Sequence, residues 1–323
     1  MRSNYSHCKT KILQATGRVG RFIVEELLKT GKHTVTAITR AESTSSLPPG
    51  VQAKKVDYSD PTTLISALQG QDALMITMSV LAPPDTQTKL ISAAASAGVP
   101  WVLPNEFGGD PLNVEQGKDI FLGAAKAKYR EQIEELGKSS WIGIACGFWY
   151  EFSLAGGPYR YGFDFKEKSL VMFDEGTTKI CTSTWPQCGR AVAALLSLKI
   201  QPEKEGEVSL STHFKNKPAY INSFTVSQKD MLESVLKATG DKVEDWKITK
   251  VDVKEYYKEG MEEFQKGNRM GFAKLLYGRS FFPDDSGDFG ATRGLDNGVL
   301  GLPKEDFDEF TKLGVEMSEK GVD

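Results

Sequence analysis

The sequence predicts an α/β protein with a Rossmann-type, doubly wound parallel sheet and a smaller mixed α+β region. Apolar strand-like runs alternate with helical patterns over about the first 146 residues. The run from 72 to 78 is apolar nearly throughout, as in a parallel strand covered on both faces. At Gly147 the character changes, because eight aromatic residues crowd the segment 147–165. We therefore expect a first domain at 9–150 and a second at 151–323.

The stretch 11–40 predicts a strand, a glycine turn, a helix and a second strand. Residues 12–13 are apolar and enter a turn at Thr16, Gly17 and Gly20. The helix that follows stops at Gly31, and 33–39 alternates as a strand. A helix N-terminus offers free N–H groups and a positive dipole end to a phosphate. Glycine there lets a pyrophosphate approach closely, so the turn predicts a dinucleotide site.

Two positions modify this prediction. Gln14 stands where the dinucleotide fingerprint has its first glycine, so the turn or the phosphate must lie differently. Arg40 ends the second strand, where NAD sites usually carry an acid for the ribose 2′-OH. A guanidinium suits a 2′-phosphate, which favours NADP over NAD. The alternatives are a glycine turn without a ligand and a solvated surface arginine.

Composition excludes several classes of function. The chain has 323 residues and a net charge of -3, without the basic block that nucleic-acid binding would need. No apolar run approaches the ~20 residues of a membrane helix, and the N-terminus lacks an apolar signal core. Four cysteines form no C-x-x-C pair, and three scattered histidines offer no metal-ligand spacing. We expect a cytoplasmic protein with reduced thiols, no metal, no nucleic acid and no membrane, either monomeric or a homodimer.

The remaining elements follow from periodicity, caps and breakers. In the first domain we expect strands at 51–56, 72–78, 99–103 and 140–146, and helices at 61–68, 85–97 and 117–136, the first of them capped by Ser59 or Asp60. In the second we expect helices at 184–198, 227–240, 253–265 and 304–317, the first of them packing back on the sheet. The glycine- and aspartate-rich segment 280–303 is either a lid or a plain surface loop.

Ligands of open α/β sheets lie outside the carboxyl ends of the strands. Besides the glycine turn and Arg40, these ends are Asp57-Tyr58, Met78-Ser79, 104–108 and Gly147-Phe148. The aromatic segment begins at the last of them. Flat apolar side chains there favour a planar apolar substrate, although about half of these aromatics should be core.

Lys126 is the candidate catalytic residue. Steps of four and three along its helix place Leu122, Lys126, Tyr129, Ile133 and Leu136 on one inward face. Burial lowers the pKa of a lysine toward the range in which it acts as a general acid or base. The alternative is a lysine whose stem packs while its ammonium reaches solvent.

The motifs resemble those of a known family. VPWVLPNEFGGD is similar to the R-F-x-P-S-E-F-G segment of the isoflavone reductase-like, NmrA-like proteins, which are atypical short-chain dehydrogenases. GQDALMIT and KAKYREQIEELG occur in the family's order, and GFWYEFSLAGG resembles a fungal branch often found in secondary metabolism. The likeness is clearest over about 11–152. Asn105 stands where the family has serine.

The resemblance implies an NADP(H) enzyme. Gly17, Arg18 and Gly20 would contact the pyrophosphate and Arg40 the 2′-phosphate. Asp57 and Tyr58 would lie near the adenine, and Lys126 would bind the nicotinamide ribose and shuttle a proton. With the strand ends above, the predicted cofactor site is Thr16, Gly17, Arg18, Val19, Gly20, Arg40, Asp57, Tyr58, Met78, Ser79, Asn105, Phe107, Lys126 and Phe148. The predicted substrate site is Phe107, Trp149, Tyr150 and Phe152.

Three functions are compatible with these observations. The first is an NADP(H)-dependent oxidoreductase acting on a planar aromatic or heterocyclic small molecule, with Lys126 as general acid or base. The second is an NmrA-like sensor that binds NADP without turnover; such members generally lack the inward lysine, whereas Gln14 slightly favours this function. The third is a redox-coupled isomerisation or cyclisation, which only the apolar pocket motivates.

Overall fold

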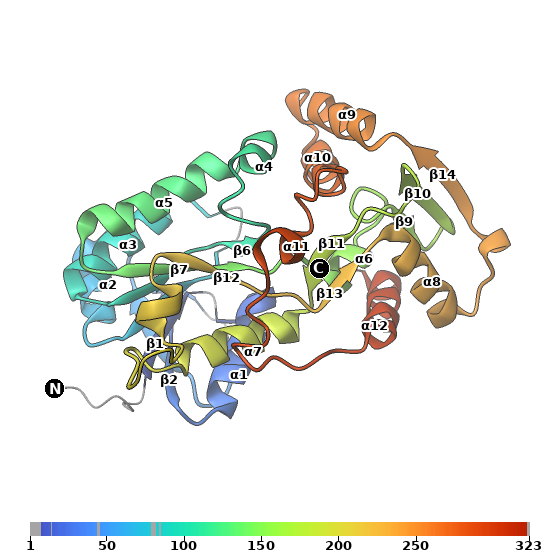
Figure 1. Ribbon diagram of the computed structural model, residues 1–323. Coiled ribbons are helices and arrows are strands. Elements are labelled where there is room, and N and C mark those ends of the chain that lie inside the picture. The colour runs from blue at the N-terminus through green and yellow to red at the C-terminus, as the bar shows by residue number, and fades with distance from the viewer. Residues whose placement is uncertain (1–7, 14, 44–45, 79–81, 84, 322–323) are drawn as a thin grey trace.

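The computed structural model describes residues 8–13, 15–43, 46–78, 82–83 and 85–321 (Figure 1). Its largest sheet has the order β12-β7-β5-β4-β1-β2-β3, with β6 beside β7, and every pair in it is parallel. The strands are β1 (Cys8–Leu13), β2 (His33–Arg40), β3 (Gln52–Val56), β4 (Ala73–Ile76), β5 (Trp101–Leu103), β6 (Phe107–Gly108), β7 (Ser140–Ala145) and β12 (Lys217–Tyr220). The order turns back between β1 and β4, which creates a crevice at their carboxyl ends.

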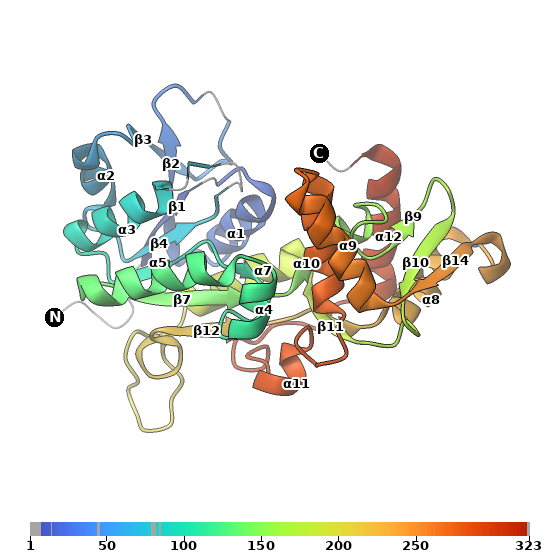
Figure 2. The same cartoon turned by 90° about the horizontal axis from the view of Figure 1, so that it is seen from above.

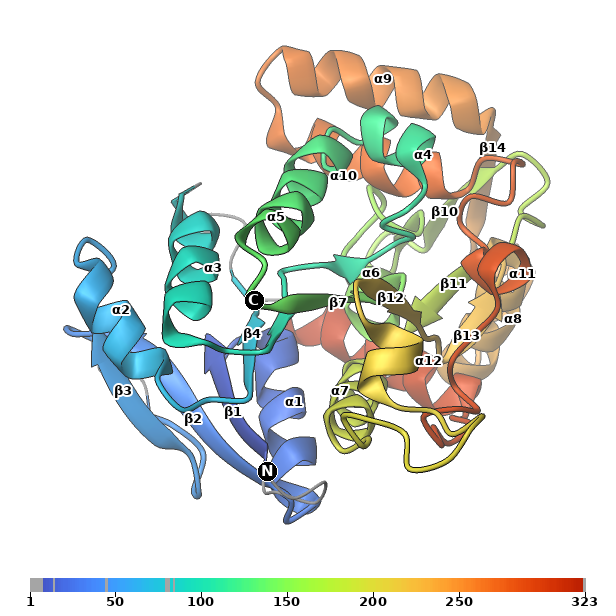
Figure 3. The same cartoon turned by 60° about the vertical axis from the view of Figure 1, so that its left-hand side comes forward.

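Helices cover both faces of this sheet (Figures 1 and 3). On one face lie α1 (Arg18–Lys29) and α7 (Trp185–Leu196); on the other lie α2 (Pro61–Leu68), α3 (Thr86–Ala97) and α5 (Gly123–Leu136). Successive residues of β4 enter opposite cores: Ala73 and Met75 pack with α1 and α7, and Leu74 and Ile76 pack with α2 and α3. The predicted doubly wound, Rossmann-type α/β fold is confirmed.

Helix α7 approaches α1 very closely. A Cβ added at Gly189 would lie 2.6 Å from the carbonyl oxygen of Phe22, so only glycine fits there. Thr184 caps α7 by accepting a hydrogen bond from the Gln187 N–H. Helix α7, which comes after residue 150, thereby covers the core that lies on the α1 side of the large sheet.

One predicted helix is wrong. The segment 117–136 contains two helices, α4 (Val114–Asp119) and α5, joined by a corner. Phe121 in that corner has a φ of 59°, a left-handed conformation that a helix cannot continue through. Gly117 and Gly123 pack against each other there, since a Cβ at Gly123 would lie 2.7 Å from the Gly117 Cα. Periodicity missed the break because the apolar spacing continues across it.

The rest of the chain builds two small sheets and a third core beside the large sheet (Figure 2). The sheets have the orders β14-β10-β9 and β13-β11-β8. Their strands are β8 (Phe148–Trp149), β9 (Phe163–Asp164), β10 (Ser169–Phe173), β11 (Ile180–Ser183), β13 (Phe224–Val226) and β14 (Lys247–Val251). The helices are α6 (Tyr150–Leu154), α8 (Gln228–Thr239), α9 (Val253–Gln265), α10 (Arg269–Ser280), α11 (Phe289–Arg293) and α12 (Phe307–Lys320), with η1 (Leu210–Phe214) and η2 (Val243–Asp245).

The segment 280–303 is fastened to the edge of the large sheet. The Asp296 carboxylate accepts a hydrogen bond from the Tyr220 N–H at 2.8 Å and lies 3.0 Å from His213 Nε2. Arg293 Nε donates to the buried Asp110 at 2.8 Å. These bonds tie it to β12 and to the loop after β6.

We expect Gly123→Ala to destabilise the fold by about 1–3 kcal/mol, because the added methyl group meets backbone atoms that cannot yield. Urea unfolding followed by circular dichroism measures the change. Gly298→Ala is the matched control: no atom lies within 4 Å of the added Cβ, so its free energy of unfolding should change by less than about 0.5 kcal/mol. Equal stability of both variants would contradict the packing described for the corner.

Candidate active site

A cavity of about 690 Å³, the turn cavity, lies where β1, β4 and β5 end. It is lined by Gly17, Arg18, Val19, Gly20, Thr77, Met78, Ala82, Pro83, Gln87, Asn105, Phe107, Leu122, Ala125, Lys126, Tyr129 and Trp149. Its volume is in the range of cofactor and small-molecule sites. Seven residues predicted for the cofactor therefore meet around this cavity, together with Lys126.

The N-terminus of α1 forms one wall of the turn cavity. Gly17 is its N-cap in extended conformation, and no side chain of the described residues caps the helix. The first N–H groups of α1 are therefore suited to a ligand phosphate. The guanidinium of Arg18 lies 4.7 Å from the centre of the Phe152 ring. The residues present thus fit a dinucleotide pyrophosphate.

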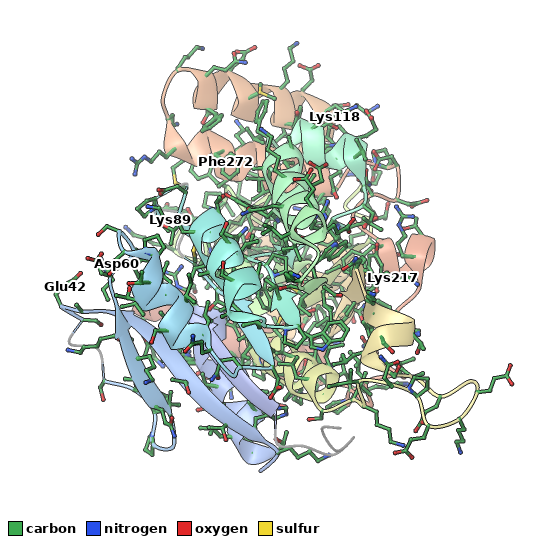
Figure 4. All side chains as sticks on the ribbon, turned by 90° about the vertical axis from the view of Figure 1, so that its left-hand side faces the viewer. Glu42, Asp60, Lys89, Lys118, Lys217 and Phe272 are labelled. Carbon is green, nitrogen blue, oxygen red and sulfur yellow. The ribbon has the colours of Figure 1, made fainter. Side chains whose placement is uncertain are left out.

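Arg40 lies at the outer end of the same sheet edge. Its side chain is 75% exposed, and its Nε is 3.6 Å from a carboxylate oxygen of Glu42, which projects from the sheet edge in Figure 4. Burial raises the pKa of Tyr58 to about 12, an effect that the nearby charge of Arg40 opposes. Asp57 accepts hydrogen bonds from the N–H and Oγ of Ser59, at 2.8 and 2.6 Å. Its carboxylate is therefore engaged in the turn before α2.

Asn105 joins the ends of β4 and β5. Its Oδ1 accepts from the Met78 N–H at 3.1 Å, and its Nδ2 donates to the Met78 carbonyl at 3.2 Å. The Asn105 N–H donates to Gln87 Oε1 at 3.0 Å. These bonds shape the floor of the turn cavity, because they fix the backbone from which Met78 projects.

A second cavity of about 310 Å³, the apolar cavity, opens beside the first. It is lined by Phe107, Gly108, Gly109, Gln116, Ile120, Leu122, Lys126, Gly147, Phe148, Trp149, Phe152, Ser153, Ile180, Cys181, Leu276, Tyr277, Ser280, Ser286, Gly287 and Phe289. Phe148 stacks on Tyr277 with ring centres 3.9 Å apart and planes 9° apart. The Tyr277 hydroxyl is 2.8 Å from Ser153 Oγ. Such walls suit a flat apolar molecule.

Tyr150 does not line either cavity. It is fully buried, and its hydroxyl is 2.7 Å from Thr311 Oγ1 of α12. It belongs to the third core with Phe224 and Phe307. Phe148, predicted at the cofactor, lines the apolar cavity only, whereas Trp149 and Phe107 line both cavities.

Lys126 lies where the two cavities meet. It is half-buried, and its Nζ is 3.7 Å from the position that a Cβ would take on Gly108. Burial lowers the pKa of Lys126, while Glu106 and Cys146 oppose that shift. The inward direction of Lys126 and Ile133 is as predicted, but Leu136 is 39% exposed, because α5 ends there beyond the core.

Other predicted positions lie apart from the cavities. Thr16 is exposed at the turn and does not line the turn cavity. Gln14 and Ser79 lie outside the described residues. Residues 286–289 line the apolar cavity and belong to the segment 280–303, which is expected to be a lid or a surface loop. The sequence missed β11 and the end of α10 in the wall of this cavity. No local pattern marks these residues, because they reach the cavity only through long-range packing.

The chain is similar to known proteins over part or most of its length. Residues 8–155 match the NmrA-like family. Oxidoreductase aprR of Aspergillus flavus is 28% identical over 307 residues, covering 93% of this chain and 96% of that protein. Isoflavone reductase homolog P3 of Arabidopsis thaliana is 35% identical over 187 residues, 53% of this chain and 54% of that protein. The solved structure of AtPrR2 with NADP+ and (+)-pinoresinol has a TM-score of 0.66 at 18% identity, covering 98% of this chain and 99% of that chain.

The sheet order and the cavities define a Rossmann-type α/β protein with a large cavity at the carboxyl ends of its parallel sheet. Its residues 8–155 match the NmrA-like family, and the chain is similar to the fungal Oxidoreductase aprR over nearly its whole length and to a plant isoflavone reductase homolog over about half of it. Among the described residues, no helix is long and apolar enough to span a bilayer. That part of the chain also holds no group of three or more His, Cys, Asp or Glu placed to bind a metal ion.

Glu151, between the aromatic residues of the site, predicts a pH-dependent stability. It is fully buried; Oε1 accepts the Trp185 N–H at 2.9 Å, and Oε2 has no partner among the described residues. Burial raises its pKa from 4.5 to about 7. The native state therefore holds this proton more tightly than the unfolded chain, so stability falls as pH rises from about 4.5 to 7.

We expect Glu151→Gln to remove this decrease in stability. The free energy of unfolding of the variant, relative to that of the parent, should be higher at pH 8 than at pH 5 by up to about 3 kcal/mol. Urea unfolding at pH 5, 6, 7 and 8 measures it. Glu135→Gln, at an exposed position of α5, should leave the pH dependence of the parent unchanged. A difference in stability between Glu151→Gln and the parent that is the same at pH 5 and pH 8 would be inconsistent with a carboxyl group buried in this way.

Proposed function

We propose that this protein is an NADP(H)-dependent oxidoreductase that acts on a planar aromatic or heterocyclic small molecule, with Lys126 as general acid or base. The observation that carries the proposal is the position of Lys126, where the turn cavity meets the apolar cavity. A proton donor at that junction can reach molecules in both cavities. The family supports the redox class, since its relatives include Oxidoreductase aprR and Isoflavone reductase homolog P3.

The residues of the turn cavity would hold the cofactor, which supplies or accepts a hydride when bound. The N–H groups at the start of α1 would bind the pyrophosphate. The guanidinium of Arg40 would bind the 2′-phosphate. The structure of AtPrR2 contains NADP+, which agrees with this cofactor.

The residues of the apolar cavity would hold and orient the substrate. Phe148, Tyr277 and Trp149 exclude water and present flat faces. Lys126 Nζ would transfer a proton to or from the substrate on the side facing the turn cavity. Its lowered pKa favours this exchange near neutral pH, because less free energy is needed to release the proton. We further propose that the reaction takes place in the cytoplasm and belongs to secondary metabolism.

Two other functions use the same site. A sensor that binds NADP without turnover would not need a lysine between the cavities, so the position of Lys126 weighs against it. A redox-coupled isomerisation or cyclisation would use the same apolar walls. Stoichiometric NADPH consumption, with a product two hydrogen atoms richer than the substrate, would exclude the latter.

We expect Lys126→Ala to lower turnover by about 100-fold or more while NADPH binds nearly as well as before, since general acid–base catalysis is lost. The measurement is NADPH oxidation with a panel of planar aromatic ketones, enones and quinones, beside a binding titration. Lys128→Ala, at an exposed position two residues further on, is the control and should keep full activity. Turnover by Lys126→Ala equal to the parent would end the role proposed for this lysine.

We expect NADPH and NADP+ to raise the thermal unfolding midpoint by a few degrees, and NADH and NAD+ to raise it less. A ligand at ~100 times its dissociation constant adds roughly 2.7 kcal/mol to the stability of the folded state. Arg40→Asp should reverse the preference, whereas Lys138→Asp makes the same charge change at an exposed residue before β7 and should not. An unaltered preference in Arg40→Asp would place the 2′-phosphate elsewhere, and no shift with any cofactor would refute the proposed function.

A further inference from the structure

The carboxylate of Glu106 is buried beside the lysine on which the proposed function rests. Glu106 follows β5 and is only 2% exposed. Its two oxygens accept hydrogen bonds from Arg130 Nη1 at 2.8 and 2.9 Å. Arg130 Nη2 in turn donates to the Pro111 carbonyl at 3.1 Å. A buried ion pair of this kind needs such partners, because desolvation of both charges opposes it.

The geometry places two cations on one helix against the loop that carries this carboxylate. Lys126 and Arg130 are four residues apart on α5 and therefore share a face. The Lys126 amino group lies above Gly108, two residues after Glu106. Both cations also line a third cavity of about 210 Å³ between α4 and α5. On the opposite side, Gly143 of β7 leaves room for the carboxylate, since a Cβ there would be 3.1 Å from Glu106 Oε2.

The charges around Lys126 come from three elements. Burial is the largest influence and lowers the pKa of Lys126. Glu106 and then Cys146, which follows β7, raise it, and Arg130 lowers it. For Glu106, burial raises the pKa, and the charges of Arg130 and Lys126 lower it. The carboxylate thus favours the ammonium form of Lys126, and Arg130 favours the free amine.

We propose that Glu106 is a positioning residue for Lys126: held in place by Arg130, its carboxylate stabilises the Lys126 ammonium and keeps a transferable proton on it. The use of that proton in catalysis rests on the function proposed above. The effect of the Glu106 charge on Lys126 does not depend on that function, because both groups are present in the protein without substrate or cofactor. Glu106 touches neither cavity-bound molecule in this role and acts only through the lysine.

The test measures the protonation of Lys126 directly. Acetic anhydride acetylates an amino group only in its uncharged form, so the labelling rate of Lys126 between pH 6 and 11 reports its pKa. Mass spectrometry of the digested full-length chain gives the rate. The reagent is small, and Lys126 lines three cavities through which it can enter. The exposed Lys128 serves as an internal standard.

Glu106→Gln should raise the labelling rate of Lys126 at pH 8 about tenfold, since loss of an opposite charge at close range lowers a lysine pKa. Arg130→Gln should lower the rate, because it removes a like charge and leaves the buried carboxylate of Glu106 with Lys126 as its remaining cationic neighbour. Glu131→Gln removes the same charge as Glu106→Gln from an exposed position of α5 and should change nothing. A general loss of structure would not raise the labelling rate of Lys126 in the first variant and lower it in the second.

A Glu106→Gln chain whose Lys126 labels with the pH dependence of the parent would overturn the inference. So would a parent chain in which Lys126 is unlabelled at every pH, since the amino group would then not lie in the cavities. A variant that fails to fold would label Lys126 as fast as Lys128, and Arg130→Gln then decides the question. Cofactor binding is measured separately by the thermal shift with NADPH, so failure of the proposed function is distinguished from failure of this inference.

Discussion

One backbone contact at Gly147 holds the two cavities together. Its φ is 65°, and a Cβ there would lie 2.0 Å from the carbonyl oxygen of Cys181. The N–H groups of Cys146 and Gly147 both donate to the Gly108 carbonyl, at 2.8 and 2.9 Å. The end of β7 is thus joined on one side to the backbone beneath Lys126 and on the other to β11. Any side chain at 147 would push apart the large sheet and the wall of the apolar cavity.

This contact explains why the aromatic segment starts where it does. Directly after Gly147, β8 pairs with β11 and directs Phe148 and Trp149 toward the cavities. The helix α6 then turns Tyr150 and Leu154 into the third core. The residues of one short segment are therefore divided between the wall of the apolar cavity and the third core. Composition alone cannot separate these two roles, which is why Tyr150 was assigned to the substrate.

The sequence predicted the elements whose signals are local. Repeated strand and helix patterns predicted the parallel sheet, Asp60 is an N-cap as expected, and the glycine turn lies at the start of α1. The break at Phe121 was missed because a positive φ in a non-glycine residue leaves no mark on periodicity. Strand β12 was missed because it pairs with β7 from some 75 residues further along the chain. Local sequence patterns do not predict strand pairings between such distant segments.

The residues that line the apolar cavity come from two parts of the chain. Phe107, Trp149 and Lys126 come from the part of the chain that matches the family, whereas Leu276, Tyr277 and Phe289 lie beyond it. Arg279 fixes this later wall: its Nε donates to Asp119 of α4 at 2.6 Å, and its Nη1 donates to Ser286 Oγ at 2.7 Å. The residues that line the turn cavity therefore all lie in the part of the chain that matches the family, whereas the shape of the later wall of the apolar cavity depends on α10 and on its ion pair with α4. Because α10 packs chiefly on α9 and also on α4, a change in this later wall would leave the strands of the large sheet in place.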